Sequence, residues 1–142
     1  MVHRVKTLPC KSILYLIFNE CYSYTSPRPS DQRSGQICAH STDVNTVCFM
    51  DENTNVLASG ADDGLVKIWD RRSLREDSPK PVGVLAGHVD GIAYISPKGD
   101  GRHLISNSKD QSIKLWDLRK FSDKSTIEQG LKAVSGQRWD YR

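Results

Sequence analysis

Residues 62–72 read Asp-Asp-Gly-Leu-Val-Lys-Ile-Trp-Asp-Arg-Arg, and the pattern returns at residues 109–119 as Lys-Asp-Gln-Ser-Ile-Lys-Leu-Trp-Asp-Leu-Arg. The two stretches align without gaps and are identical at five of eleven positions. Their tryptophans, Trp69 and Trp116, are 47 residues apart. Recurrence at such a spacing indicates an internal structural repeat.

The match extends upstream of both stretches. Residues 57–60 (Leu-Ala-Ser-Gly) match residues 104–107 (Leu-Ile-Ser-Asn), and the two histidines, His40 and His88, are 48 residues apart. These separations lie at the upper edge of the roughly 40–45 residues typical of propeller repeats with four strands per unit.

Each unit reads as short strands joined by turns. Residues 44–49 alternate apolar and polar side chains, as a half-buried strand does. Asp63 followed by Gly64 is a strong hairpin signal because both residue types tolerate positive φ. The strands predicted for the first unit are 44–49, 56–59, 65–69 and 82–85, and those for the second are 92–95, 103–106 and 112–116. A fourth strand of the second unit is not evident.

The units resemble WD40 repeats over about residues 36–120. The resemblance implies an all-β fold, a partial WD40 β-propeller of about two four-stranded antiparallel blades in an incomplete ring. Within residues 34–120 we expect the repeats at about 36–85 and 86–120. Residues 1–33 show no match and read as a leader or linker, and residues 121–142 read as a polar C-terminal segment.

In the family, one His, Ser, Asp and Trp form a hydrogen-bonded tetrad inside each blade. A buried indole N–H needs an acceptor, and a buried carboxylate is costly unless it accepts hydrogen bonds. Ser and His can connect the two. The matching positions are His40, Ser59, Asp63 and Trp69, then His88, Ser106, Asp110 and Trp116. Ala39 stands where the family usually has Gly, which is a mild departure.

Ser, His and Asp together also raise the possibility of a hydrolase. Nucleophilic catalysis needs an exposed Ser beside an oxyanion hole, and no Gly-x-Ser-x-Gly elbow occurs in the chain. Because the trio occurs twice in register with a Trp, we interpret it as structural and expect no enzyme. The four cysteines form no Cys-x-x-Cys clip, so we expect no metal, and no cofactor is implied.

Both repeats continue as Trp-Asp-x-Arg, which places Asp70 with Arg72 and Asp117 with Arg119. This resembles the box of WD40 proteins that dock on the damaged-DNA-binding adaptor of cullin-4 RING ubiquitin ligases. The resemblance implies a substrate receptor that docks through these four residues and recruits protein substrates, whose identity the sequence does not give, for ubiquitylation. The alternative is a generic WD40 scaffold with other partners, in which each Arg only decorates a loop.

The rest of the chain argues against nucleic-acid and membrane partners and contains one box-like stretch that does not end a blade. A net charge of +3 is too small to favour nucleic acid or an acidic membrane surface, and the six-residue apolar run 13–18 cannot span a bilayer. We therefore expect an intracellular protein of the nucleus and/or cytoplasm with reduced thiols. The box-like residues 139–142 lie too close to Trp116 to end another blade. Propellers close with four to eight blades, so we expect a partial product that is aggregation-prone or partly disordered when expressed alone.

Overall fold

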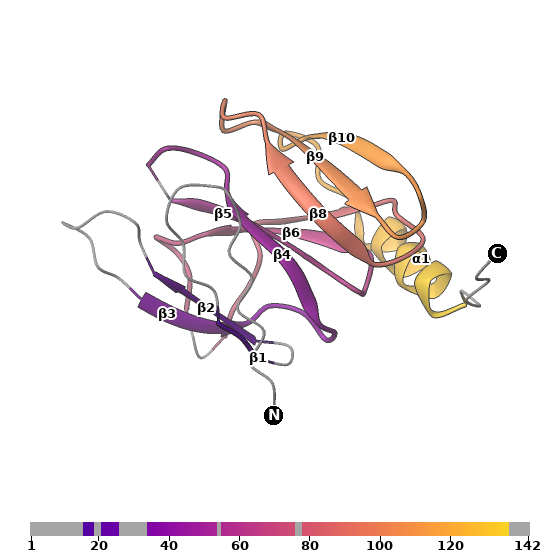
Figure 1. The fold of residues 1–142 in the computed structure, drawn as a ribbon, viewed down its shortest axis with the longest axis horizontal. Coiled ribbons are helices and arrows are strands. Elements are labelled where there is room, and N and C mark those ends of the chain that lie inside the picture. Colours follow the sequence, from indigo (N-terminus) through magenta and orange to yellow (C-terminus); the bar gives the residue numbers. More distant parts are fainter. Residues whose placement is uncertain (1–15, 19–20, 26–33, 54, 76–77, 137–142) are drawn as a thin grey trace.

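The computed structural model describes residues 16–18, 21–25, 34–53, 55–75 and 78–136, with side chains described from Ile37 onward. These ranges contain ten strands and one helix. The strands are β1 (Leu16–Phe18), β2 (Cys21–Thr25), β3 (Ser34–Cys38), β4 (Val44–Phe49), β5 (Val56–Ala61), β6 (Leu65–Asp70), β7 (Gly83–Ala86), β8 (Ile92–Pro97), β9 (His103–Ser108) and β10 (Ile113–Asp117). They form three sheets that follow one another across the molecule (Figure 1).

The sheets are antiparallel, and strands adjacent in the chain pair with each other. Their orders are β1-β2-β3, β4-β5-β6-β7 and β8-β9-β10. This is the predicted all-β architecture of partial propeller blades. The first repeat forms a four-stranded blade, and the second forms three strands in the described part of the chain, in line with a fourth strand that the sequence does not show.

The path of the chain after β10 explains the missing strand. The backbone turns at Asp117, whose C=O accepts from the Lys120 N–H at 3.0 Å. It then reaches the outer strand of the first blade, where the Ser122 N–H donates to the Val84 C=O at 2.9 Å. The residues that follow β10 therefore cover the edge of β7 instead of adding to the edge of β10.

The sequence repeat and the blade are out of phase. β3 precedes the inner strands β4, β5 and β6 in the first repeat, but it pairs with β2 of the preceding sheet. β1 and β2 arise from the predicted leader, of which residues 1–15, 19–20 and 26–33 lie outside the described residues. Each repeat thus contributes its first strand to the sheet before it.

The two blades pack face to face through an apolar layer. Side chains of Ala58, Val66 and Ile68 on the first blade lie in one buried cluster with Ile92, Ile95 and Leu104 of the second. Gly60 permits this close approach, because a Cβ there would lie 2.6 Å from Ile92 Cγ2. A second buried cluster joins Ile37 and Ala39 to the opposite face of the first blade, around Leu57 and Trp69.

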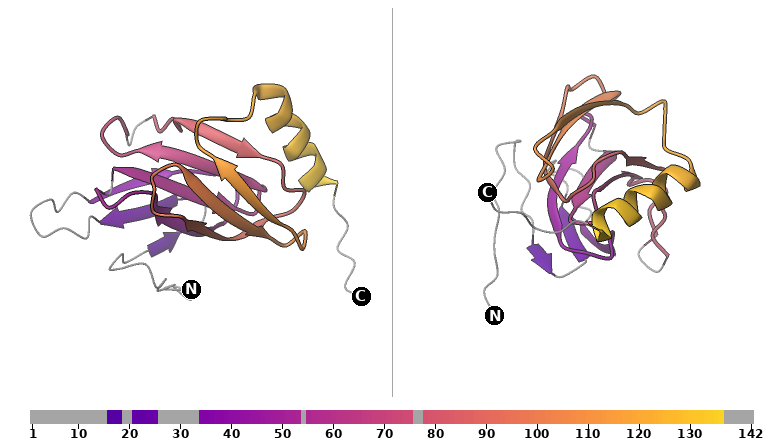
Figure 2. Two further views of the ribbon diagram at one scale, coloured as in Figure 1. Left: turned by 90° about the horizontal axis from the view of Figure 1, so that it is seen from above. Right: turned by 90° about the vertical axis from the view of Figure 1, so that its right-hand side faces the viewer.

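Residues 124–135 form a helix that the sequence pattern did not predict. α1 (Lys124–Ser135) begins at Asp123, whose carboxylate accepts from the Thr126 N–H at 2.9 Å. It contacts β7 and β6 at the outer side of the first blade (Figure 2). The described part of the C-terminal segment is therefore folded against the blade.

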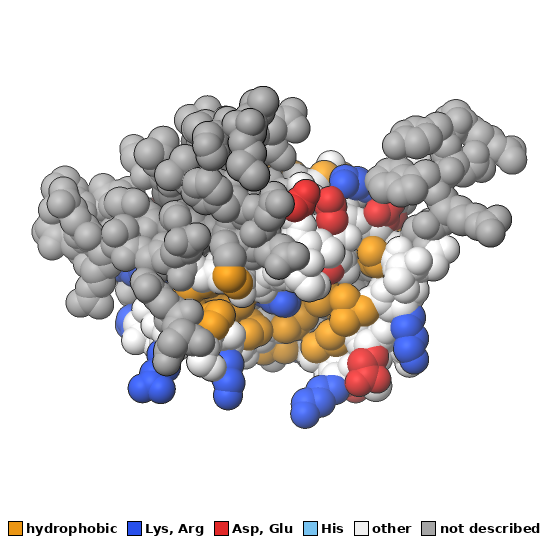
Figure 3. All heavy atoms as spheres, turned by 90° about the horizontal axis from the view of Figure 1, so that it is seen from below, with side chains coloured by type: hydrophobic (Ala, Val, Ile, Leu, Met, Phe, Trp, Pro, Cys, Tyr) orange, Lys and Arg blue, Asp and Glu red, His pale blue; other side chains and the backbone are white. Residues whose placement is uncertain are grey.

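The sheet β8–β10 leaves apolar surface uncovered among the described residues. Ile113 and Leu115 are 71% and 72% exposed, and Leu115 lines a hollow of about 300 Å³ with Ile105. A further band of hydrophobic side chains lies between charged ones on the face seen from below (Figure 3). Exposed apolar patches of this kind are typical of interaction surfaces or of surfaces prone to aggregation.

Cysteine placement departs in part from expectation. Cys48 is a buried reduced thiol in β4, as expected of a small apolar side chain. Cys38 is exposed and disulfide-bonded, so the expectation of reduced thiols was wrong at this position. In the described part of the chain, no helix is long and apolar enough to cross a membrane.

Candidate protein-interaction site

The first predicted tetrad lies in one hydrogen-bonded chain. Trp69 Nε1–H donates to Ser59 Oγ at 2.9 Å, and Ser59 Oγ lies 2.8 Å from His40 Nε2. His40 Nδ1 lies 2.8 Å from Asp63 Oδ2. All four groups are satisfied if His40 is neutral and carries its proton on Nδ1, since the serine hydroxyl then donates to Nε2.

The second quartet has the same connectivity. Trp116 Nε1–H donates to Ser106 Oγ at 2.7 Å, and Ser106 Oγ lies 2.7 Å from His88 Nε2. His88 Nδ1 lies 2.9 Å from Asp110 Oδ2. Burial of Asp110 works to raise its pKa, but hydrogen bonds from Ser112, His88 and backbone amides outweigh burial and hold that pKa well below its ordinary value.

The geometry gives both serines a structural role. The side chains of Ser59 and Ser106 are 0% exposed, and each hydroxyl oxygen already accepts an indole N–H. A nucleophile must reach its substrate, which neither hydroxyl can do in this arrangement. Each tetrad instead links the second strand, the turn and the third strand of its sheet to the histidine in the segment before the first strand.

The Trp-Asp-x-Arg box folds in the same way in both repeats. Arg72 donates from Nε to Asp70 Oδ1 at 3.0 Å and from Nη2 to Asp70 Oδ2 at 2.7 Å, and its backbone N–H donates to Oδ1 at 2.9 Å. Arg119 binds both Asp117 oxygens at 3.0–3.3 Å, with its backbone N–H 3.0 Å from Oδ1. The aspartate therefore fixes the direction of each guanidinium.

These arginines are presented to solvent. The side chains of Arg72 and Arg119 are 68% and 64% exposed, whereas their aspartates are mostly covered. Hydrogen bonds from Arg72 hold the pKa of Asp70 below its ordinary value, against the opposite effect of burial. The Asp70 carboxylate thus stays ionised, and each arginine keeps N–H donors beyond those that bind its aspartate.

Both boxes lie at the same end of the blades. Arg72 and Arg119 follow the third strand of each sheet, at the end where the first strand turns into the second. The charge of Asp51 in that turn adds a small upward contribution to the pKa of Arg72, after the larger contributions from Asp70. A Cβ on Gly101 in the matching turn would lie 4.0 Å from Asp51 Cβ. The two turns are therefore neighbours and join both boxes into one face, which we call the box face.

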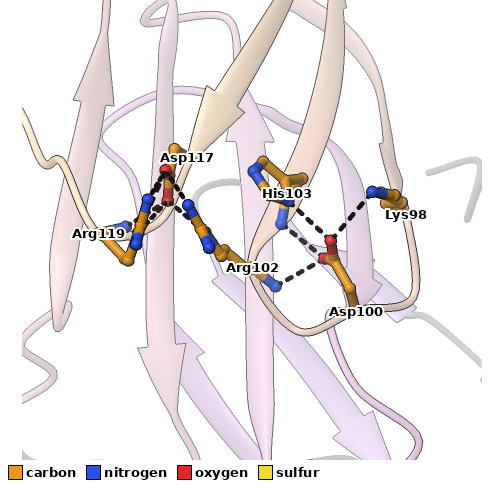
Figure 4. Close-up of polar contacts among 6 residues, drawn as sticks. All are labelled: Lys98, Asp100, Arg102, His103, Asp117 and Arg119. Carbon is orange, nitrogen blue, oxygen red and sulfur yellow. Dashed lines mark hydrogen bonds and ion pairs between the residues drawn. The ribbon is translucent and has the colours of Figure 1, made fainter.

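The second box contains a group that the sequence motifs did not single out. Arg102 donates from Nε to Asp117 Oδ1 at 3.3 Å and from Nη2 to Oδ2 at 3.1 Å. Asp117 therefore lies between two guanidinium groups, Arg102 and Arg119, from different loops (Figure 4). Beside them, Asp100 accepts from His103 Nδ1 at 2.7 Å, and Lys98 Nζ lies 3.5 Å from it.

Strand register was the signal that could have located Arg102. Asp117 pairs with His103 across the hairpin, so the residue before β9 lies opposite the residue after β10. The Leu118 N–H accordingly donates to the Arg102 C=O at 2.9 Å. The first repeat has Asn55 at this place, where its C=O accepts from the Arg71 N–H at 2.8 Å. A motif search finds positions at which the two repeats have the same residue. It therefore misses Arg102, because the first repeat has Asn55 at that position.

Other sequence predictions are only partly covered by the structure. The box-like residues 139–142 lie outside the described residues. Among the side chains that are described, no group of three or more His, Cys, Asp or Glu residues could hold a metal ion.

Comparison with known proteins identifies the repeats. The family model "WD domain, G-beta repeat" matches residues 32–70 and 79–117, which together make up more than half of the chain. Each match runs from the outer strand of one sheet to the third strand of the next, in agreement with the phase difference between repeat and blade.

Several curated proteins are similar to the chain. The DDB1- and CUL4-associated factor 11 homolog of Caenorhabditis elegans is 53% identical over 104 residues, which cover 73% of this chain and 18% of the relative. The LEC14B protein of Lithospermum erythrorhizon is 49% identical over 113 residues, 80% of this chain and 23% of the relative. Histone acetyltransferase type B subunit 2 of Aspergillus oryzae is 35% identical over 105 residues, 70% of this chain and 22% of the relative.

A solved structure supports the fold alone. A chain in the structure described as "Apo ctPRC2 in an autoinhibited state" superposes with a TM-score of 0.61 at 22% identity, covering 80% of this chain and 25% of that one. The chain spans between 18% and 23% of the length of these three curated relatives. With two matched repeats, two blades and these relatives, the chain belongs to the WD40 repeat family.

Proposed function

We propose that this chain is part of a substrate receptor that docks on DDB1, the adaptor of CUL4 ubiquitin ligases, through its box face. The observation that carries the proposal is the duplicated arrangement of Asp70 with Arg72 and Asp117 with Arg119, both exposed at one end of adjacent blades. A relative at 53% identity is named for association with DDB1 and CUL4.

The chemistry of the box face fits a docking role. A guanidinium held by its own aspartate is already oriented, so less conformational entropy is lost when it binds a partner. Its remaining N–H groups can donate to carboxylates or carbonyls of the adaptor. Two such groups on neighbouring blades fix both position and orientation of a rigid partner.

The same proposal assigns no chemistry to the chain itself. It recruits protein substrates, and ubiquitin transfer takes place on other subunits. We place the protein inside the cell, in the nucleus and/or cytoplasm, where that ligase works. Imaging of a tagged protein in cells tests this placement.

The test removes both guanidinium groups in a complete propeller that carries these repeats. Arg72→Ala with Arg119→Ala should abolish co-purification of DDB1 without changing the melting temperature, because both side chains are exposed. Lys124→Ala with Lys132→Ala on α1 removes the same charge away from the box face and should leave DDB1 recovery unchanged. Full recovery of DDB1 with the double arginine variant would refute the proposal.

A generic WD40 scaffold is the second candidate. A relative at 35% identity is named as a subunit of a histone acetyltransferase, which favours a chromatin partner for this alternative. If histones co-purify with the protein and DDB1 does not, the scaffold function is favoured.

A further inference from the structure

The two halves of the box face, one on each blade, differ in formal charge. The turn before β5 carries Asp51 and Glu52, whereas the matching turn before β9 carries Lys98, Asp100 and Arg102. The first box adds Asp70, Arg71 and Arg72, a net charge of +1, and the second adds Asp117 and Arg119, which cancel. The half of the face on the first blade is therefore acidic, and the half on the second blade carries a net positive charge.

The positive half is also preformed. Asp100 accepts from the backbone N–H groups of Arg102 at 2.9 Å and His103 at 2.8 Å, as well as from His103 Nδ1. These bonds shape the turn and direct the Asp100 carboxylate toward it, while the Arg102 side chain is 41% exposed beside Asp117. The turn thus holds Arg102 in place before any partner arrives.

Arg102 and Arg119 share one counterion. Both donate Nε to Asp117 Oδ1 and Nη2 to Asp117 Oδ2, so two positive charges surround a single negative one. The excess charge is positive, and each guanidinium retains N–H donors beyond those that bind Asp117. The first box lacks this arrangement because Asn55 occupies the place of Arg102.

We propose that Arg102 and Arg119 together form a carboxylate-binding pair, so that an acidic segment of the adaptor seats on the β8–β10 half of the box face. This inference rests on the proposed docking function and makes Arg102 a third docking residue. The acidic turn of the first blade repels that segment, which gives the partner one orientation along the face.

The test replaces Arg102 with asparagine, the residue that the first repeat has at the equivalent position, Asn55. In a complete propeller, Arg102→Asn should weaken DDB1 binding about five- to tenfold, and Arg102→Glu should weaken it further. Both effects should shrink at high salt because the attraction is screened. The reciprocal change Asn55→Arg should not weaken binding. Lys132→Gln on α1 loses the same charge as Arg102→Asn and should change the Kd less than twofold.

The outcomes separate this inference from the proposed function. If Arg102→Asn binds within twofold of the wild-type protein while Arg72→Ala with Arg119→Ala abolishes binding, the inference is overturned and the docking function stands. If the double variant also binds fully, both are overturned. If Arg102→Asn lowers the melting temperature and leaves the salt dependence of binding unchanged, Arg102 is a structural residue and the inference is again overturned.

Discussion

The blade β4–β7 and the sheet β8–β10 contain the same tetrad, yet they differ in how well it is covered. Trp69 is 1% exposed, whereas Trp116 is only partly buried. Hydrogen bonds within each tetrad have nearly equal lengths in the two sheets. The tetrad is therefore set by local strand register, while its burial is supplied by the neighbouring elements.

The faces of the two sheets show the same contrast. Ala58, Val66 and Ile68 are buried against β8 and β9. Their counterparts in the repeat, Ile105, Ile113 and Leu115, are exposed. Stability of equivalent positions should therefore differ according to what covers them.

Replacing the equivalent apolar pairs with serine should give the largest difference in free energy of unfolding between the two sheets. Val66→Ser with Ile68→Ser removes buried methyl groups and leaves hydroxyls in the core, which should cost about 5 kcal/mol in free energy of unfolding. Ile113→Ser with Leu115→Ser should change it by less than about 0.5 kcal/mol and reduce self-association. Urea unfolding and sedimentation velocity measure the two quantities. Equal destabilisation by both pairs would show that the exposed face is covered in solution.

The two tryptophans give the next effect. Trp69→Ala should cost about 4 kcal/mol, since it creates a cavity and removes the donor to Ser59. Trp116→Ala should cost about half as much because part of that ring is already in contact with water. Urea unfolding followed by circular dichroism compares the variants without relying on tryptophan fluorescence. A larger loss at Trp116 would mean that burial does not set the contribution of each ring.

Substitutions in the turns between the second and third strands should change the free energy of unfolding by a smaller amount, and in opposite directions in the two sheets. Gly64 has φ of 75°, and its counterpart Gln111 has φ of 66°, a left-handed conformation that disfavours side chains with a Cβ. Gln111→Gly should stabilise the second sheet by about 1 kcal/mol. Gly64→Gln should destabilise the first by more, because a Cβ there would lie 2.6 Å from Val134 Cγ2. Thermal melting measures both, and a destabilised Gln111→Gly variant would contradict the turn assignment.

The smallest expected effect is a pH dependence. The pKa of Asp110 is lowered in the fold, so its ionised form adds stability above the unfolded pKa of about 4. That stability declines as the pH falls below about 4 toward the folded value. Asp110→Asn should flatten this decline in melting temperature between pH 6 and pH 3, with Asp90→Asn as a control in the same sheet. Identical slopes for the wild-type protein and Asp110→Asn would contradict it.

Strand pattern and motif positions were readable from the sequence because they depend on local order. The two quartets repeat in register, and the turn after Asp63 recurs after Asp110, although Gln111 stands where the first repeat has Gly64. Each of these features depends on contacts within one hairpin, or between a hairpin and the histidine in the segment before the sheet.

Features that depend on longer-range pairing were not readable. Arg102 reaches Asp117 only through the register of β9 with β10. The second sheet has three strands in the described residues because residues after β10 return to β7. The helix α1 was missed although Ile127, Leu131 and Val134 recur at helical spacing, because this short apolar stripe lies among polar residues and packs without burying any residue of the helix.

The most direct test of the docking account is a cryo-electron microscopy structure of a complete propeller with these repeats bound to DDB1. Both the Arg72 and Arg119 guanidinium groups should lie within about 4 Å of adaptor oxygen atoms, with the turn before β9 against the same surface. A complex in which the adaptor contacts another side of the propeller and both arginines remain in solvent would contradict the account.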